Sequence, residues 1–161
     1  MGEEFEDEVI EQSINPMPKS IATAINKIML ALENNENSSI IDLDSSKIKE
    51  IKNNILQKLQ LDRVTLKSFH KKLKDYRYCS DLSDLKVGNY IRWISLKNPE
   101  KLNLTNGAFF VDYIFNNNMM KIICRSSRGR TFQIKFDEVI IFQKLNNEES
   151  VILSVLDYLK K

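Results

Sequence analysis

The stretch from Leu85 to Lys144 constrains the fold most, because short β-rich runs separated by turn residues follow one another through it. Asn, Gly and Asp occupy the intervening turns, as expected where positive φ angles or tight reversals are needed. We predict five strands, over residues 89–95, 108–115, 119–125, 131–136 and 139–144. A long loop after the first strand and a tight turn before the last are typical of a small, strongly bent barrel. The expected fold class is therefore α+β, with a five-stranded antiparallel SH3-like β-barrel at residues 84–145.

The sequence on both sides of the predicted barrel has helical periodicity. Apolar residues recur at spacings of three and four within residues 19–80 and again after Asn147. The third helix is expected to start after Asp62 and to carry Tyr76 on its apolar face. The predicted organisation is an acidic flexible tail over 1–18, a segment of about three helices over 19–80, the barrel, and a C-terminal helix over 147–161 that packs on the barrel.

Charge is distributed unevenly along the chain, although the net charge is only +2. Residues 1–42 carry nine acidic and two basic side chains, whereas residues 43–80 carry four acidic and ten basic ones. Residues 81–145 are also basic, with ten basic and six acidic side chains. One hypothesis is that the acidic tail folds back on the basic middle of the chain and competes with a ligand there.

Membrane and secreted classes are not expected. The longest uninterrupted apolar run, over residues 28–32, has five residues, whereas a membrane-spanning helix needs about 18 or more. Cys79 and Cys124 lie far apart and form no C-x-x-C pair, which fits a reduced intracellular compartment. The expected localisation is intracellular.

Catalytic and metal-binding motifs are not found in the sequence. His70 is the only histidine and lies in a lysine-rich helix, with no local partner for a nucleophile. One His and two separated Cys residues cannot form the usual zinc site, and no phosphate-binding glycine motif occurs. We therefore predict a non-enzymatic protein without a metal or another cofactor.

Basic and aromatic side chains alternate along the predicted strands. If Ile91, Trp93, Phe109 and Val111 point inward, the outer face holds Tyr90, Arg92, Phe110, Lys121, Arg125, Gln133 and Lys135, flanked by Arg128 and Arg130. Single-stranded nucleic acids are bound by such surfaces, with Tyr90 and Phe110 as stacking candidates. The alternative is that these are ordinary outward polar positions, partly covered by the helices.

Two further features suggest binding. Lys67, Lys71 and Lys74 form a stripe on the third predicted helix, which either binds phosphates or is a solvated face. Trp93, Tyr90, Tyr113 and Phe115 are candidates for an aromatic cage of the Tudor type, which binds methylated side chains through cation–π attraction.

Several short motifs resemble those of a viral protein group. They are L-K-x-G-x-Y-I-R-W-I from Leu85, the run 106–111, Phe132-Gln133-Ile134 and the run 140–142. The pattern is similar to small uncharacterised proteins of the nucleocytoplasmic large DNA viruses. Ala108 departs from the double glycine of that pattern, and Phe132 stands where the pattern has Trp. The resemblance implies a viral source and a virion or replication role, and it carries over no catalytic residue.

The sequence thus predicts a binding or structural protein that acts through protein–protein contacts of a small β-barrel, in the host cytoplasm or in a virion. Nucleic-acid binding by the basic face is the first alternative, and a Tudor-like reader of methylated side chains is the second. A protein partner is expected, and the oligomeric state is left open.

Overall fold

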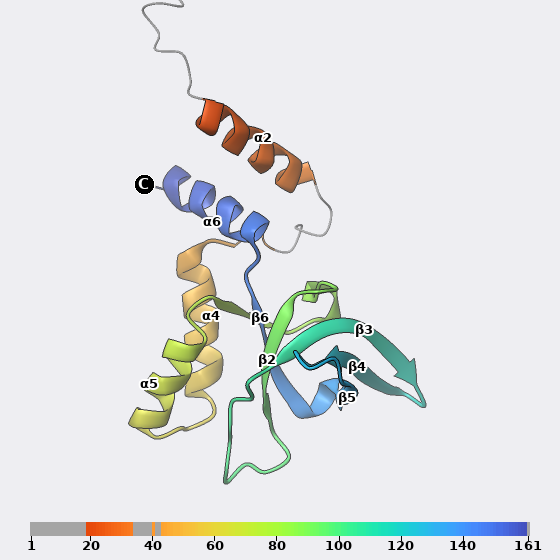
Figure 1. Cartoon of the computed structure of the whole chain (residues 1–161). Coiled ribbons are helices and arrows are strands. Elements are labelled where there is room, and N and C mark those ends of the chain that lie inside the picture. Colours follow the sequence, from red (N-terminus) through yellow and green to blue (C-terminus); the bar gives the residue numbers. More distant parts are fainter. Residues whose placement is uncertain (1–18, 34–39, 41–42, 161) are drawn as a thin grey trace, which may run out of the picture.

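The computed structural model describes residues 19–33, 40 and 43–160 (Figure 1). The acidic tail predicted over residues 1–18 lies outside the described residues. The helices are α2 (Lys19–Glu33), α4 (Ser45–Gln57), α5 (Arg63–Lys72) and α6 (Asn147–Leu159). The strands are β1 (Tyr76–Cys79), β2 (Tyr90–Ser95), β3 (Ala108–Asn116), β4 (Met119–Arg125), β5 (Thr131–Lys135) and β6 (Val139–Lys144). Two short 3₁₀ turns are η2 (Leu82–Asp84) and η3 (Phe136–Glu138).

The strands form one open antiparallel sheet in the order β1-β6-β2-β3-β4-β5. The α+β class is confirmed, but the sheet has six strands where we expected five, and β1 and β5 are its two edges. The additional strand is β1, which pairs with β6 from Tyr76 opposite Lys144 to Cys79 opposite Ile141.

Strand β1 replaces the last turns of the helix that we predicted to include Tyr76. Helix α5 ends at Lys72, and the buried ammonium of Lys52 donates hydrogen bonds to the carbonyls of Leu73 (2.7 Å) and Tyr76 (3.0 Å). Leu73 is the C-cap of α5, and Tyr76 is the first residue of β1, so Lys52 joins the end of the helix to the start of the strand. The sequence Tyr-Arg-Tyr-Cys then continues as a strand, for which aromatic residues have a high propensity.

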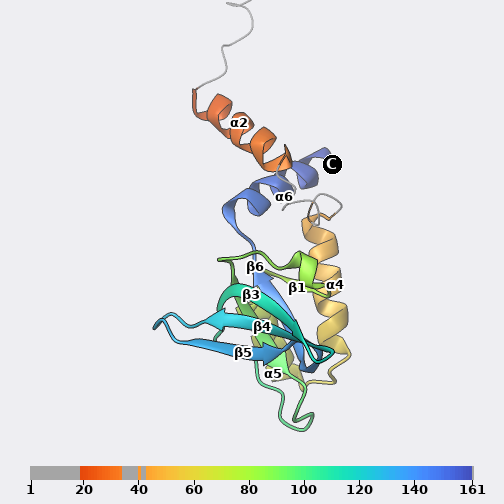
Figure 2. The same ribbon diagram turned by 90° about the vertical axis from the view of Figure 1, so that its right-hand side faces the viewer.

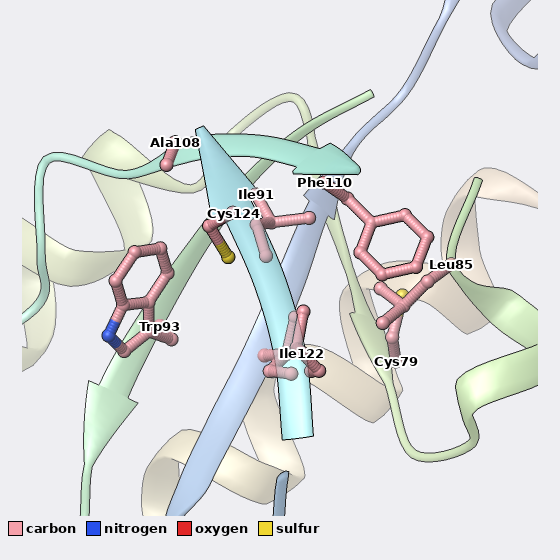
Figure 3. Packing of buried hydrophobic residues seen from close by; sticks show 9 residues of the cluster. Cys79, Leu85, Ile91, Trp93, Ala108, Phe110, Ile122 and Cys124 are labelled. Atoms are coloured by element: carbon pink, nitrogen blue, oxygen red, sulfur yellow. The ribbon is translucent and has the colours of Figure 1, made fainter. Parts of the chain in front are cut away.

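Each face of the bent sheet buries its own core. The inner core packs side chains of the sheet against one another, and Figure 3 shows Phe110 beside Leu85 and Cys79 within it. The outer core packs the sheet against α4 and α5, with Leu56 and Phe69 of the helices against Ile94, Ile140 and Phe142. Because both faces are used, the strands β2 and β6 are buried on both sides.

Helix α6 lies beside α2 at the end of the molecule away from the β3–β4 hairpin (Figures 1 and 2). Asn146 caps its N-terminus in a reciprocal capping box with Glu149. We expected this helix on the barrel, but its buried residues Ile152 and Leu153 pack with Ile40 and Ile48 in a third cluster. Glu149 of α6 contacts the sheet, where it pairs with Arg77 of β1. Among the described helices, none is long and apolar enough to cross a bilayer.

Candidate binding surfaces of the sheet

The side chains at the start of β3 point to the opposite faces of the sheet from those that we predicted. Phe110 is therefore not available as a stacking residue. Phe110 was expected outside, but it is 3% exposed and lies in the inner core with Ala108. Phe109, expected inside, is 39% exposed. It packs edge-on against Tyr90, with 5.1 Å between the ring centroids, and lies opposite Arg125 of β4.

The phase of β3 follows from the close approach of its first residues to β2. Gly107 has φ +99°, and a Cβ at this position would lie 2.4 Å from the carbonyl oxygen of Ile91. Only glycine fits there, and Ala108 then lies opposite Ile91 with its side chain in the core. A shift of one residue in a strand exchanges its two faces.

A bulge between Phe110 and Asp112 changes the phase of β3 again. Beyond the bulge, Tyr113 pairs with Ile122 and therefore shares the inner side of the sheet, as Phe115 does two residues later. These two rings are 52% and 65% exposed. The β3–β4 hairpin extends past the core, away from the helices (Figure 1).

Three of the predicted nucleic-acid contacts cluster on the next hairpin. Arg125, Arg128 and Arg130 are all exposed, and the β4–β5 hairpin that carries them points away from α4 in Figure 2. Its tight turn is closed by a hydrogen bond from the Gly129 amide to the Ser126 carbonyl (2.9 Å), with Gly129 at φ +85°.

Other predicted contacts on the sheet are engaged within the protein. The Nε of Arg92 donates to the carbonyl of Thr105 at 2.8 Å, and the hydroxyl of Tyr90 donates to the carbonyl of Asn106 at 2.8 Å. Both side chains therefore hold the long loop between β2 and β3. Lys135 lies 3.6 Å from a carboxylate oxygen of Glu138, and it is the cross-strand neighbour of Lys121.

The lysine stripe of α5 belongs to a different surface. Lys67 and Lys71 of α5, and Lys74 just beyond its end, are exposed, but α5 covers the outer core of the sheet rather than extending the arginine hairpin. The predicted basic residues are therefore divided among the β4–β5 hairpin, the Lys121–Lys135 pair and the α5 stripe. Sequence reasoning alone could not separate them, because the separation depends on how the helices pack.

The strand β5 has a free edge in the described part of the chain. The Ser126 amide donates to the Arg130 carbonyl at 2.8 Å, which fixes these residues as a hydrogen-bonded pair. Because hydrogen-bonded and non-hydrogen-bonded pairs alternate along an antiparallel ladder, Thr131, Gln133 and Lys135 point their N–H and C=O groups away from β4. Their side chains are also exposed.

A pocket of about 300 Å³ lies next to this free edge. Its lining combines the end of β2 and the residue Lys97 beyond it with β4, β5, η3 and the start of β6, and consists of Trp93, Ser95, Lys97, Lys121, Gln133, Ile134, Lys135, Glu138 and Val139. Apolar groups are supplied by Trp93, Ile134 and Val139. The charged groups are three lysines and Glu138, which also pairs with Lys97 at 3.2 Å. The pocket thus joins an apolar floor to a rim with excess positive charge.

The opposite edge of the sheet is covered. Helix α4 lies against β1, and the ammonium of Lys52 in α4 donates a hydrogen bond to the carbonyl of Tyr76. Three of the four residues of β1 are buried. An exposed strand edge is a template for pairing with another chain. Among the described strands, β5 presents such an edge beside a pocket, and the projecting end of β3, whose residues 112–116 pair with β4 alone, presents another.

A buried ionic cluster fixes α6 to the sheet. The carboxylate of Glu149 is fully buried and lies 3.5 Å from Nε of Arg77 and 3.4 Å from Nζ of Lys86. Gln143 of β6 accepts from the Lys86 amide at 2.8 Å and donates to the Asp84 carbonyl at 2.9 Å. The network has two cations around one carboxylate and lies inside the protein, so we assign it a structural role.

The thiols and the histidine are not poised as nucleophiles. Burial raises the pKa of Cys79 to about 12 and that of Cys124 to about 11, so both thiols stay protonated at neutral pH. Burial, and then the charge of Lys52, lowers the pKa of His70. Within the described ranges, no group of three His, Cys, Asp or Glu side chains is placed to hold a metal ion.

The four candidate cage aromatics lie in different surroundings. Trp93 is in the inner core, 5.9 Å from the ring of Phe132, whereas Tyr90 packs on the outer side against Phe109. Tyr113 and Phe115 are on the projecting hairpin. A cage needs three or four rings around one point, and the positions of Trp93 and Tyr90 on opposite sides of β2 separate two of them.

No protein-family model matches the chain, and no characterised protein or solved structure shows significant similarity to it.

Proposed function

We propose that the protein is a non-enzymatic binding protein whose sheet accepts an extended segment of a partner protein as an additional strand along β5. The observation that carries this proposal is the difference between the two edges of the sheet. Edge β1 is covered by α4, whereas β5 presents outward backbone groups beside a pocket. Addition of a strand supplies affinity through backbone hydrogen bonds, and pockets for alternate side chains supply specificity.

The connectivity of the last five strands supports an SH3-like description of the site. Their order is β6-β2-β3-β4-β5, with a long loop after β2 and the single turn η3 between β5 and β6. In this description the barrel is left open between β5 and the end of β2. The pocket is lined from both of these strands, so an added strand would lie at the opening.

The expected affinity is moderate. Three outward residues of β5 offer donors and acceptors, and one intramolecular hydrogen bond contributes about 1 kcal/mol net. One apolar side chain buried in the pocket adds about 2 kcal/mol. After the loss of freedom of an extended peptide, we expect a dissociation constant on the order of micromolar.

The test begins with selection of extended peptides of about twelve residues from a random display library on the full chain. The affinity of each selected peptide is then compared for Gln133→Pro and Gln133→Ala. Proline removes the outward N–H of position 133 without breaking a bond to β4, so an edge strand tolerates it. We expect peptide binding to be lost in Gln133→Pro and kept in Gln133→Ala. Equal affinities in the two variants would refute strand addition, provided that both unfold at similar temperatures.

Nucleic-acid binding by the β4–β5 hairpin is a second candidate function. It is favoured by the exposed Arg125, Arg128 and Arg130 next to the partly exposed ring of Phe109. Three phosphate contacts predict that affinity for duplex DNA falls about 40-fold between about 50 and 200 mM salt. Fluorescence anisotropy tests this, with the three arginines changed to Gln. The matched control changes Lys67, Lys71 and Lys74 to Gln.

The remaining sequence-based predictions have less support. The resemblance to proteins of large DNA viruses stays a prediction, and under it the partner would be a virion or replication protein. A Tudor-like function is disfavoured by the positions of Trp93 and Tyr90 on opposite sides of β2.

A further inference from the structure

We propose that the projecting end of β3 pairs with the same strand of a second copy of the chain, antiparallel and about a two-fold axis beside Ile114. The segment concerned is residues 112–116, which pair with β4 on one side. Strand β2 meets β3 only at Ala108 and Phe109, so no described strand lies along the other side of the segment. This contact is independent of strand addition at β5.

The outward backbone groups of the segment belong to Tyr113 and Phe115. Alternation along the two ladders of β4 makes Lys121 and its partner Ile114 a hydrogen-bonded pair. The N–H and C=O groups of the two neighbours of Ile114 therefore point away from β4. The amide of Tyr113 agrees with this, because it donates to Oδ1 of Asp112 at 2.8 Å.

These outward groups are placed symmetrically about Ile114. When Ile114 lies opposite Ile114 of the second copy, each Tyr113 lies opposite a Phe115 of the other chain. Both of these are then hydrogen-bonded pairs, and each pair exchanges two N–H···O bonds. A two-fold contact of this kind uses the same edge in both copies, so assembly stops at a dimer.

The side chains suit the same pairing. Tyr113 and Phe115 are 52% and 65% exposed and share the inner side of the sheet, and aromatic cross-strand pairs stabilise a sheet. Asp112, the one charged residue of β3, would lie opposite the uncharged Asn116, so the two carboxylates do not face each other. Edge strands are commonly protected by lysine or proline, and residues 112–116 contain neither.

The expected dimer is weak. Four half-exposed rings contribute about 100 Å² each, so the contact stays below the roughly 1,000 Å² of a stable complex. Asp112 also competes with the second copy, because its carboxylate holds the Tyr113 amide. We therefore expect half of the chains to be paired at a concentration on the order of 100 µM.

The first experiment is sedimentation equilibrium of the full chain between about 5 and 500 µM, where the mass should rise from that of one chain towards that of two. Asp112→Ala frees the Tyr113 amide in both copies and should tighten the dimer about tenfold. The charge control is Glu100→Ala, which is exposed and distant from β3 in sequence. It should leave the dissociation constant unchanged.

Proline at each edge shows which strand forms the contact. Phe115→Pro removes an outward N–H and a ring without breaking a bond to β4, and it should abolish the dimer. Gln133→Pro makes the same backbone change on β5 and should leave the dimer intact. Loss of the dimer in Gln133→Pro alone would place the contact at β5 and overturn the proposal.

Disulfide trapping tests the register without proline. Ile114 opposite itself is a non-hydrogen-bonded pair with Cα atoms about 4.5 Å apart, which suits a disulfide. Oxidation should therefore link Ile114→Cys chains into covalent dimers. Asn116→Cys chains should stay unlinked, because their cysteines would lie about 14 Å apart, but they should link to Asp112→Cys chains when the two are mixed.

Two results would overturn the dimer. One is the mass of a single chain up to about 500 µM in both the unsubstituted and the Asp112→Ala chains, together with no cross-link at Ile114→Cys. The other is cross-linking of Asn116→Cys chains to one another at least as fast as Ile114→Cys chains. Neither result bears on strand addition at β5, which the selected peptides test separately.

Discussion

Glu149 of α6 and Arg77 of β1 form an ion pair inside the protein, with 3.5 Å between the carboxylate Oε2 and the guanidinium Nε. The side chains are 0% and 4% exposed, and Lys86 shares the same carboxylate oxygen. This contact joins the C-terminal helix to the covered edge of the sheet. Together with Ser45, whose amide donates to Asp157 at 3.0 Å, it sets the position of α6.

Removing the charge of Glu149 should strongly destabilise the fold. Glu149→Gln keeps the side-chain acceptor that bonds the Asn146 amide, but it removes the negative charge that faces two buried cations. Breaking a buried ion pair from one side costs about 3–5 kcal/mol. Urea unfolding should show a loss of this size. Glu50→Gln, exposed on α4, is the control, with a change within about 0.5 kcal/mol.

Two glycines with similar backbone angles should respond differently to alanine. Gly88 has φ +88° and no atom within 4 Å of the place where a Cβ would lie, whereas a Cβ at Gly107 would lie 2.4 Å from a backbone oxygen. The positive φ alone costs about 1–2 kcal/mol. Gly88→Ala should lose about that much stability, and Gly107→Ala at least about 3 kcal/mol, because the backbone of β2 has to move. Equal losses in thermal or urea unfolding would contradict the close approach of β3 to β2.

The two thiols should be unreactive in the native protein. With pKa values raised to about 12 for Cys79 and about 11 for Cys124, very little thiolate exists near pH 8. Ellman's reagent should therefore label neither thiol in native conditions and both in guanidinium. Rapid labelling of the native chain at either cysteine would show that the inner core opens easily.

The single histidine should make stability depend on pH near neutrality. The folded-state pKa of His70 lies below its ordinary value of 6.5 because of burial and the charge of Lys52. The unfolded chain therefore binds this proton more readily, and stability falls as pH drops below about 6.5 towards the folded-state pKa. The free energy of unfolding is measured at about pH 7.5 and pH 5. The decrease should be smaller in His70→Gln, and an identical decrease would exclude this residue as the cause.

Turn chemistry made most of the sheet predictable from the sequence. Strands β4 and β6 have the predicted limits, because the asparagine turn, the Gly129 turn and the Phe136–Glu138 turn mark their ends. Strand β1 was missed because its residues continue the apolar spacing of α5. The turn between α5 and β1 is held by Lys52, which is distant in sequence and reaches the carbonyls of Leu73 and Tyr76 only after α4 and α5 have packed together.

The binding surface was less predictable, since it depends on strand phase and sheet order. Ala108, Phe109, Phe110 and Val111 are all apolar, so alternation does not show which of them are inside. The sequence signal was Gly107, whose close approach to the backbone of Ile91 determines which side chains of β3 point inward. The free edge of β5 is a property of the strand order, which the local sequence does not encode. Lys121 and Lys135 were identified, but as outer-face residues rather than as the rim of a pocket.

The most direct test of strand addition is the NMR structure of a complex between the full chain and a peptide selected on it. The account predicts inter-strand backbone NOEs between the peptide and residues 131–135, with one apolar peptide side chain close to the indole of Trp93. It also predicts slowed amide exchange at Gln133 in the complex. A peptide whose NOEs go only to the arginine hairpin or to α5, with the β5 amides unchanged, would contradict the account.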